Sequence, residues 1–536
     1  MKVLNEGAIM CRKFCLLMVT LAWGFSLCAA GQMCPPRPSV GAAISNPLDL
    51  FSQNGTLTLN LDLRSEIGST GFTHYCYVYL DHGNPVEAPT LRLNPGDRLV
   101  INFTNHITAV GRAPKSRHAP MAPMEMGDMH AAAAQGNPCL GGMVTATSTN
   151  IHFHGLNVPP VCHQDEVIKT VIPNNGQQFQ YSVQIPANDP PGLYWYHPHP
   201  HGFTATQVYG GAAGALIIEG SSSLTQGLNE RILTIRRNVD AVTDDDGQFT
   251  VNFEPANYPR RALPVINNVV AGHREFWRVV NASTNGFLAL QVLSPAARPL
   301  QVISLDGVPL SQPLSMTTIY LPPAGRAEFI VPALVADTPS YLVTQGFNTG
   351  SIGDPMPAAR LAQIRVSAGT QEVHEAHVAP PPIAAPRFSG LASVTPNTTR
   401  SLYFSETNVG TNGPGQFFIT VDGAKPRTFA PNNPPAITTN VGAVEDWTIA
   451  NQTAEPHAFH MHQIHFLLTA INGQAVANPE LVDTVTVPPW SGTGPYPNVT
   501  VRMDFRDPNI AGTFVYHCHI LDHEDGGMMA KIVVNP

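Results

Sequence analysis

The stretch Gly442-AVEDWTIA-Asn451 carries the pattern that decides the fold. A glycine opens it, a run of mostly apolar and aromatic residues follows, and an asparagine closes it nine positions after the glycine. Two further copies are Gly96-DRLVINFT-Asn105 and Gly272-HREFWRVV-Asn281. Each copy indicates a turn followed by a β-strand, because Val, Ile, Phe and Trp favour strands. Three copies at intervals of 176 and 170 residues indicate a domain repeated three times.

The composition agrees with short strands joined by turns. Of 536 residues, 44 are Gly and 50 are Pro, and they are scattered among apolar runs. This scatter excludes coiled coils, helical bundles and wholesale disorder. Each repeat is therefore predicted to be a β-sandwich, which makes the chain all-β. A net charge of −9 without a long basic run argues against a nucleic-acid partner.

Two stretches indicate domain boundaries near residues 222 and 372: the Gly/Ser-rich Gly220-SSS-Leu224 and the Pro-rich Val378-APPPIAAP-Arg387. The predicted organisation is a leader at 1–30, a first domain at 31–222 with an insertion at about 106–149, a middle domain at 223–372, a linker at 373–390 and a third domain at 391–536.

The first thirty residues resemble an export signal. Arg12 and Lys13 precede an apolar stretch from Phe14 to Cys28, and small residues follow. We expect the leader to be removed and the protein to be periplasmic or secreted; an uncleaved anchor is the alternative. No comparable apolar stretch follows, so we expect no membrane span in the mature chain.

Five cysteines follow the leader: Cys34, Cys76, Cys139, Cys162 and Cys518. In an oxidising compartment four of them can form two disulfides, whose pairing the sequence leaves open. Cys518 lies between two histidines, an arrangement suited to a metal thiolate, so we expect it to be the unpaired one.

Histidines gather in four clusters, two in the first domain and two in the third. The clusters are Ile151-His152-Phe-His154-Gly155, Trp195-Tyr-His197-Pro-His199-Pro-His201-Gly202, His457-Ala-Phe-His460-Met-His462, and His517-Cys518-His519-Ile-Leu-Asp-His523-Glu-Asp-Gly-Gly-Met528. One His-x-His is weak evidence for a metal site, but four such clusters in two of three repeats are not accidental.

Strand geometry sorts the histidines of the third domain into two sets. Residues two apart on a strand share a face, so His517 and His519 point one way and Cys518 points the other. His460 and His462 likewise share a face that His457 does not. One side therefore collects Cys518, His457, His523 and Met528, which is the donor set of a blue-copper electron-transfer site.

The other side collects His460, His462, His517 and His519, and the first domain offers two more pairs, His152/His154 and His197/His199. Eight imidazoles are too many for one copper ion and suggest a cluster of about three ions. In the middle domain Phe287, Leu290 and Val292 stand at the positions of His457, His460 and His462. That domain is therefore expected to be a spacer without metal.

These motifs resemble those of the multicopper oxidases, and the similarity extends over nearly the whole mature chain. The forms Trp-Tyr-His-Pro-His-x-His-Gly and His-Glu-Asp-Gly-Gly-Met-Met are closer to the branch of bacterial laccases and cuprous oxidases than to fungal laccases. The resemblance implies three consecutive cupredoxin-like Greek-key sandwiches. It also implies four copper ions, a small-molecule or metal-ion electron donor, and dioxygen as the acceptor.

Carried over residue by residue, the resemblance assigns each ligand to one of three copper types. His457, Cys518, His523 and Met528 would hold the type 1 copper, His152 and His460 the type 2 copper, and His154, His197, His199, His462, His517 and His519 the type 3 pair.

Two carboxylates fall where the family has its proton relay, Glu524 and Asp165. A carboxyl group can carry protons beside copper when its surroundings shift its pKa. The alternative for both is a plain carboxylate, which for Asp165 would lie on the surface. His201 and His465 match no ligand position, so we expect them to lie behind the ligands or in solvent.

Four methionines of the first-domain insertion lie close together, spaced by Pro, Gly, Ala and acidic residues: Met121, Met124, Met126 and Met129. Thioethers suit Cu(I), so one hypothesis is a Cu(I)-collecting lid. In the cuprous oxidases, however, the Met-rich insertion lies in the third domain. A mobile surface loop is the alternative.

We therefore expect an oxidase of laccase type, acting on phenols, aromatic amines or metal ions. A cuprous oxidase in copper tolerance is the close alternative. A copper-free structural relative is disfavoured because every expected ligand is present. A copper nitrite reductase is disfavoured because it lacks paired His-x-His motifs in its first domain.

Overall fold

The computed structural model describes residues 34–68, 71–108, 110–111, 137–220, 222–238, 248–256, 262–370, 387–407 and 415–536. The predicted leader, most of the predicted linker and Met121, Met124, Met126 and Met129 lie outside these residues. In the described part of the chain, no helix is both long and apolar enough to cross a bilayer.

The first sandwich packs two five-stranded sheets face to face. Its first sheet has the order β4 (Asn84–Glu87), β3 (Thr73–Asp81), β2 (Thr56–Ile67), β6 (Arg98–His106), β8 (Gln178–Gln184). Its second has the order β1 (Asp49–Phe51), β5 (Thr90–Leu93), β10 (Gly214–Ile218), β9 (Gly192–His197), β7 (His152–His154). The 3-10 helix η1 (Pro138–Leu140) and the helix α2 (Thr204–Tyr209) lie between these strands in sequence.

The middle sandwich pairs a seven-stranded with a five-stranded sheet. The larger has the order β13 (Glu254–Pro255), β12 (Gln248–Val251), β11 (Asn229–Asn238), β15 (Glu275–Asn281), β20 (Arg326–Val331), β17 (Leu300–Leu305), β18 (Val308–Met316). The smaller has the order β14 (Val265–Val270), β22 (Ala359–Ser367), β21 (Ser340–Thr344), β16 (Leu288–Leu293), β19 (Ile319–Leu321).

The third sandwich repeats this plan. Its larger sheet has the order β24 (Gln416–Val421), β23 (Thr398–Thr407), β26 (Ala443–Asn451), β32 (Asn498–Phe505), β28 (Phe466–Ile471), β29 (Gln474–Ala475), with β30 (Leu481–Val482) also paired to β28. Its smaller sheet has the order β25 (Ile437–Asn440), β34 (Met529–Asn535), β33 (Gly512–Cys518), β27 (His457–Met461), β31 (Thr484–Val487). Three short helices complete it: η2 (Leu391–Ser393), η3 (Pro508–Ile510) and α3 (Leu521–Asp525).

The repeated sequence pattern has the same structure in all three sandwiches. Its strand is β6, β15 or β26, and each pairs in parallel with the first long strand of its sheet. Gly96, Gly272 and Gly442 precede these strands with φ of 89°, 80° and 95°, a conformation that glycine adopts without steric cost. The glycine therefore supplies the turn into an inner strand of each sandwich.

The asparagine that ends each copy anchors the next loop. Asn105, Asn281 and Asn451 are completely buried. In each case the side-chain oxygen accepts the backbone N–H two residues further on. The side-chain amide donates to backbone carbonyls of two loops. The glycine and the asparagine, nine residues apart, therefore fix the two ends of the same strand.

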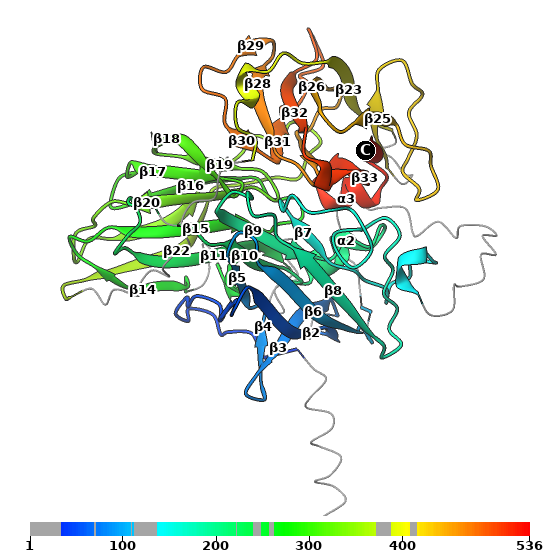
Figure 1. The fold of residues 1–536 in the computed structure, drawn as a ribbon. Helices are drawn as coiled ribbons and strands as arrows, with labels where there is room; N and C mark the ends of the chain where they lie inside the picture. The colour runs from blue at the N-terminus through cyan, green and yellow to red at the C-terminus, as the bar shows by residue number, and fades with distance from the viewer. Residues whose placement is uncertain are drawn as a thin grey trace, which may run out of the picture.

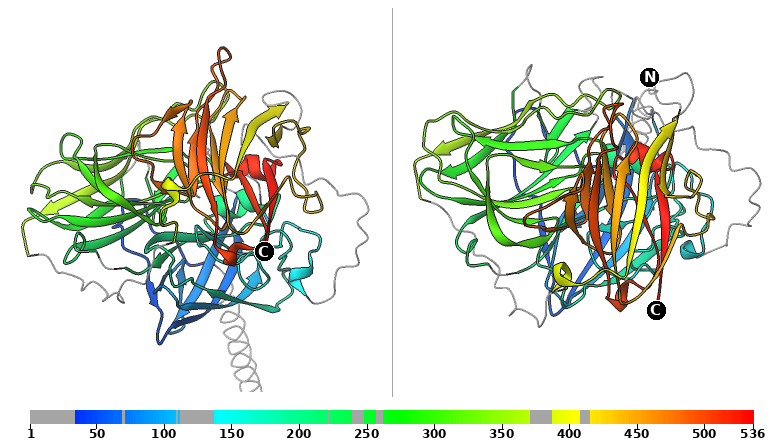
Figure 2. Two further views of the ribbon diagram at one scale, coloured as in Figure 1. Left: turned by 45° about the horizontal axis from the view of Figure 1, so that its top comes forward. Right: turned by 90° about the horizontal axis from the view of Figure 1, so that it is seen from above.

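The first sandwich contacts the middle one through β9 and β10, which face the larger sheet of the middle sandwich. In Figure 1 the third sandwich (orange to red) lies above the first (blue to cyan), with the middle one (green) beside both, and Figure 2 shows the same arrangement from two other sides. The strands β9 and β10 are buried along their whole length. Their second face packs on Ile232, Val280 and Ala324 of the middle sandwich. Because of this packing, the histidines of β7 and β9 are enclosed.

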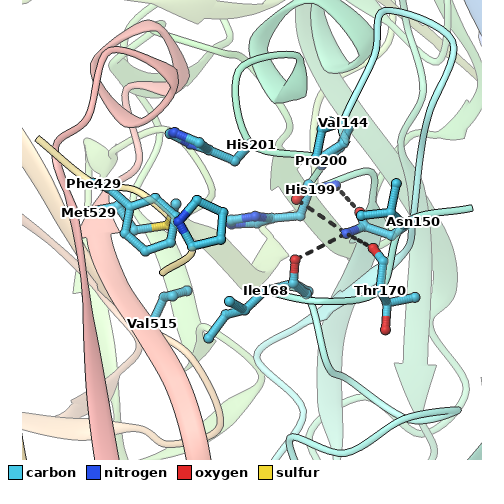
Figure 3. A pocket seen from close by; sticks show the side chains of 13 residues that line it. Val144, Asn150, Ile168, Thr170, His199, Pro200, His201, Phe429, Val515 and Met529 are labelled. Atoms are coloured by element: carbon cyan, nitrogen blue, oxygen red, sulfur yellow. Dashed lines mark hydrogen bonds between the residues drawn. The ribbon is translucent and has the colours of Figure 1, made fainter. Parts of the chain in front are cut away.

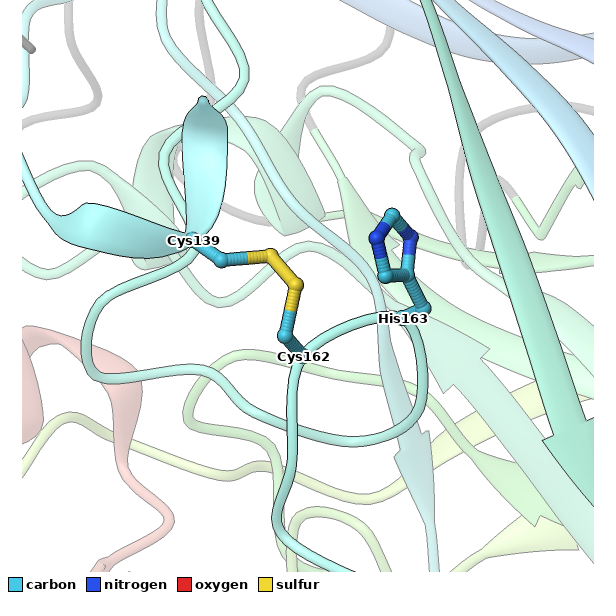
Figure 4. A group of neighbouring side chains, drawn as sticks. All are labelled: Cys139, Cys162 and His163. Atoms are coloured by element: carbon cyan, nitrogen blue, oxygen red, sulfur yellow. A yellow bond between two sulfur atoms is a disulfide. The ribbon is translucent and has the colours of Figure 1, made fainter.

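Two disulfides join Cys34 to Cys76 and Cys139 to Cys162, and Cys518 is the free, buried cysteine of the described residues. This pairing was open from the sequence, whereas the unpaired Cys518 was expected. His163 lies beside the second disulfide (Figure 4). Both sulfurs there are bonded to each other, so this surface group presents no thiolate.

Candidate metal centres

Cys518 and two histidines form a compact, buried group inside the third sandwich. The Cys518 Sγ lies 3.5 Å from Nδ1 of His457 and 3.8 Å from Nδ1 of His523, and the two Nδ1 atoms are 3.3 Å apart. All three side chains are completely buried. Three converging donors at these separations can hold one metal ion.

Each of the two rings has a polar side chain close to its far nitrogen. Nε2 of His457 donates to the hydroxyl of Thr453 at 2.8 Å, and Nε2 of His523 lies 3.2 Å from the carboxylate of Glu455. These partners leave both Nδ1 atoms facing Cys518. Met528 is buried in the same apolar core, and its carbonyl accepts the backbone N–H of Cys518 at 3.1 Å.

A second group collects eight histidines between the first and third sandwiches. The strands β7 and β9 pair with His152 opposite His197, and β27 and β33 pair with His460 opposite His517. Three sets of converging ring nitrogens result: His152, His154 and His460; His154, His197 and His519; and His199, His462 and His517. The alternation along β33 places Cys518 on the other side of the strand from His517 and His519.

Most rings of this group keep one nitrogen tied to an oxygen and turn the other inward. His197 and His517 donate from Nδ1 to backbone carbonyls, and His152 donates from Nδ1 to Asp165. Within the described chain, these buried ring nitrogens of the group have no hydrogen-bond partner: Nε2 of His152, Nδ1 of His154, Nε2 of His197, Nε2 of His460, Nδ1 of His462 and both nitrogens of His519. Buried polar atoms without partners are rare in proteins, so these nitrogens point to a missing ligand.

Electrostatics keep these rings neutral. Burial, followed by the neighbouring imidazoles, lowers the pKa of His152, His154, His199, His462 and His519 well below its ordinary value. Burial also lowers the pKa of His197 to about 3 and that of His517 to about 4. A neutral imidazole has a lone pair to donate to a metal, and imidazole sets with a thiolate nearby suit copper.

Two carboxylates lie directly behind the histidine group. Asp165 is buried, accepts from Nδ1 of His152 at 2.9 Å and from the amide of Gln463 at 2.5 Å, and burial raises its pKa to about 8. The alternative of a surface carboxylate is therefore wrong for Asp165. Glu524 is completely buried, 3.6 Å from Nδ1 of His199 and 3.5 Å from Nδ1 of His517. Burial, with Asp525 beside it, raises the pKa of Glu524 well above its ordinary value.

Sequence reasoning missed a third carboxylate, Asp483, and its partner Arg326. The Asp483 carboxylate lies 3.2 Å from Nε2 of His154, and its backbone oxygen accepts from Nδ1 of His460 at 2.8 Å. Burial alone would raise the pKa of Asp483, but the guanidinium of Arg326 holds it below its ordinary value. The one signal in the sequence was a lone acid within the apolar run Leu481-Val-Asp483-Thr-Val485.

His465 and His201 also lie close to the histidine group. His465 is buried and donates from Nε2 to the carbonyl of Asp306 at 2.8 Å, so it lies behind the ligands rather than in solvent. His201 packs edge-on against Phe429. Figure 3 shows His201 and His199 lining one small cavity, whose other walls are mostly apolar and include Val515 and Met529.

A second small cavity lies over His523. It is lined by Asp354, Glu455 and Asp522, together with Asn285 and Phe287 of the middle sandwich. Asn285 donates to Asp354 at 2.7 Å, which fixes that carboxylate at the rim. None of the described residues that line this cavity is Lys or Arg. The surroundings of His523 are therefore acidic.

Comparison with known proteins adds three family matches. Models described as multicopper oxidase match residues 144–223, 220–368 and 394–536. The multicopper oxidase mco of Staphylococcus haemolyticus is 24% identical to this chain, covering 89% of it and 88% of its own length. The laccase of Bacillus subtilis is 24% identical, covering 71% of this chain and 78% of its own length.

Solved structures resemble the whole fold. A multicopper oxidase from Campylobacter jejuni, described as a metallo-oxidase, superposes with a TM-score of 0.65 at 22% identity, covering 94% of this chain and 98% of its own. McoA from Aquifex aeolicus gives 0.64 at 21% identity, covering 93% and 100%. A laccase-like CueO from Ochrobactrum gives 0.60 at 20% identity, covering 93% and 100%. This likeness confirms the predicted fold class, three consecutive cupredoxin-like sandwiches.

Proposed function

The chain belongs to the multicopper oxidase family, and from this premise we propose that it is an exported oxidase of laccase type whose preferred electron donor is a metal ion. As a family member it is an oxidoreductase that uses copper. The observation that carries the proposal is the pair of buried donor groups on opposite sides of β33, joined through Cys518 and its two neighbours.

The donor atoms fit copper. We assign the type 1 site to His457, Cys518, His523 and Met528, and the type 2 site to His152 and His460. We assign the two type 3 ions to the triads His154, His197, His519 and His199, His462, His517. The buried ring nitrogens without hydrogen-bond partners support this assignment, as do the two Nδ1 atoms that face Cys518. When bound, the four ions would supply a one-electron acceptor and a site at which dioxygen is reduced to water.

The protein connects the two sites through its own backbone. Cys518 is bonded directly to His517 and His519, which belong to different triads. The distance between the sites is therefore set by single peptide units within β33 and the residue after it. Burial of both groups keeps water away from Cys518 and the histidines, so reduced dioxygen species stay enclosed.

Asp165 and Glu524 are suited to deliver protons. Each touches one or two of the assigned ligand histidines through the nitrogen that faces away from the cluster. Burial raises the pKa of both carboxyl groups, so each can hold a proton near neutral pH and release it when negative charge develops nearby.

The cavity over His523 favours a small cationic donor over a bulky phenol. Its carboxylates Asp354, Glu455 and Asp522 would attract a cation to the edge of the ring. This acidic surface is the observation that favours the alternative of a cuprous oxidase.

Steady-state oxygen consumption with Cu(I), Fe(II) and a phenol, measured side by side, tests the proposal. We expect Asp354→Asn to raise KM for both metal ions roughly five-fold, the effect of removing one charge about 4–8 Å away, with little change for the phenol. Asp337→Asn, an exposed carboxylate of the same sandwich, serves as control. Equal loss for ions and phenol would contradict a metal-ion donor, and a purified protein without copper would contradict the oxidase itself.

Deleting residues 118–130 tests the methionine segment separately. If the segment collects Cu(I), the deletion raises KM for Cu(I) and leaves Fe(II) oxidation unchanged. Unchanged Cu(I) turnover would favour the alternative of a surface loop.

A further inference from the structure

The guanidinium of Arg326 contacts all three sandwiches at one point. Arg326 is the first residue of β20 in the middle sandwich, and its side chain is completely buried. Nη1 and Nη2 bind the two carboxylate oxygens of Asp483, in the third sandwich, at 2.7 and 2.5 Å. Nε donates to the carbonyl of Leu193, on β9 of the first, at 3.3 Å.

The turn between β17 and β18 strengthens this contact. Its residue Asp306 accepts the backbone N–H groups of Asp483 and Thr484 on one oxygen and that of Arg326 on the other. Its carbonyl accepts Nη2 of Arg326 at 2.8 Å. Asp306 and Arg326 together hold the backbone and the carboxylate of Asp483 from the middle sandwich.

Asp483 in turn orients two histidines of the cluster in opposite senses. Its carboxylate accepts from Nε2 of His154, which leaves Nδ1 of that ring facing inward. Its backbone carbonyl accepts from Nδ1 of His460, which leaves Nε2 facing inward. One residue therefore selects the tautomer of a ring from the first sandwich and of a ring from the third.

Gly155 shows how closely the pair is fitted to His154. A Cβ at this position would lie 2.5 Å from Nη2 of Arg326 and 2.8 Å from the Asp483 carboxylate, and its φ is 88°. The ion pair between Arg326 and Asp483 approaches the backbone at Gly155, so only a residue without a side chain fits there. A side chain at position 155 would therefore collide with the ion pair.

We propose that Arg326 is a positioning residue for the copper cluster shared by the first and third sandwiches. The proposal rests on the copper assignment made under Proposed function. The proposal gives the middle sandwich a role in the site besides separating the other two. The guanidinium of Arg326 fixes the position of Asp483, and Asp483 fixes the inward nitrogens of His154 and His460. The type 1 group of Cys518 does not depend on this contact.

The test compares Arg326→Gln and Arg326→Lys in the full-length protein. Lysine keeps the charge but cannot form the bidentate fork. We expect copper to fall from about four ions per chain to about one in R326Q, with blue absorption retained, since only the cluster loses its support. In R326K we expect intermediate copper content and an altered type 2 electron paramagnetic resonance signal.

Arg231→Gln is the matched control. Arg231 makes an equally bidentate, buried pair with Glu275 in the same sandwich, at 2.7 and 2.7 Å. R231Q should keep both the blue absorption and the type 2 signal. If R326Q fails to fold, the copper content and type 2 signal of R326K alone test the proposal.

An R326K protein with the wild-type copper content and type 2 signal overturns the proposal. Loss of the blue and cluster copper in equal proportion also overturns it, because a general loss of packing would have that effect. A wild-type protein that binds no copper would instead refute the proposed function, so the two failures are distinguishable.

Discussion

The carboxylate of Asp525, at the end of α3 in the third sandwich, accepts the backbone N–H of Ala205 in α2 of the first sandwich at 2.8 Å. Its other oxygen accepts the N–H groups of Gly202 and Thr204 at 2.8 and 3.3 Å. A side chain of the third sandwich therefore provides acceptors for the backbone N–H groups at the start of a helix in the first. This side chain, Asp525, directly follows His523 and Glu524 in sequence. Figure 1 shows the two helices side by side.

Asp525→Ala removes this contact and leaves buried N–H groups without acceptors. We expect a loss of about 2–4 kcal/mol in the free energy of unfolding, since each unsatisfied buried group costs about 1–3 kcal/mol. Denaturant unfolding measures the effect, with Asp446→Ala as control. Asp446 forms a half-exposed pair with Arg502 and should cost under about 1 kcal/mol. Equal effects of the two substitutions would show that Asp525 does not join the sandwiches.

Cys518→Ser separates the two proposed copper sites. A serine hydroxyl is a poor ligand for copper compared with a thiolate, so the blue absorption should vanish. The eight histidines of the other group lie on the opposite side of the strand, and the type 2 resonance signal should remain. Copper analysis should give about three ions per chain. A variant that stays blue would refute the assignment of Cys518.

Asp165→Asn should slow the oxygen half of the reaction and spare the donor half. The amide cannot carry a proton but can occupy the same space between His152 and Gln463. General acid catalysis of this kind contributes roughly 10²–10⁴-fold, so oxygen consumption should fall by about that range. The rate at which a donor bleaches the blue protein without oxygen should stay unchanged. If bleaching slows equally, Asp165 acts on the type 1 site instead.

Local sequence rules predicted a large part of this structure. The Gly-strand-Asn pattern located an inner strand of each sandwich, because the turn glycine and the loop-anchoring asparagine are local requirements. The alternation of side chains on a strand separated Cys518 from His517 and His519. Both rules involve residues close together in sequence.

Contacts between the sandwiches could not be predicted in the same way. Arg326, Asp483 and Leu193 are more than 130 residues apart in sequence, and no periodicity relates them. The partners of the cysteines were open for the same reason, because several pairings were compatible with the chain. Asp165 was placed by resemblance, but its hydrogen bond with Gln463 of the third sandwich was not predicted. Long-range packing decides these features, and it leaves little trace in one sequence.

Asn281→Ala tests the loop anchor where no metal site interferes. The side-chain amide of Asn281 donates to the carbonyls of Gly286 and Pro322 at 2.7 and 2.8 Å, and its oxygen accepts the N–H of Ser283. Alanine leaves these buried groups unsatisfied, so we expect about 3 kcal/mol of destabilisation. The half-exposed Asn102→Ala should change the stability by less than about 0.5 kcal/mol. A mild effect at Asn281 would mean that the loops do not need this anchor.

Asp189 should make stability depend on pH in a narrow window. It is buried, accepts the amide of Asn157 at 2.7 Å, and burial raises its pKa from 3.8 to about 6 despite Arg387. Between about pH 4 and pH 6 the folded chain retains a proton that the unfolded chain has lost. The contribution of Asp189 to the free energy of unfolding therefore falls as pH rises through this window, by up to about 3 kcal/mol, and is constant on either side. Asp189→Asn keeps the shape of the side chain but cannot titrate, so the difference in stability between wild type and variant isolates the effect of Asp189.

Unfolding midpoints of the two proteins, measured from pH 3.5 to pH 7, should diverge as pH rises, with the variant the more stable above pH 6. Parallel curves would show that Asp189 titrates normally.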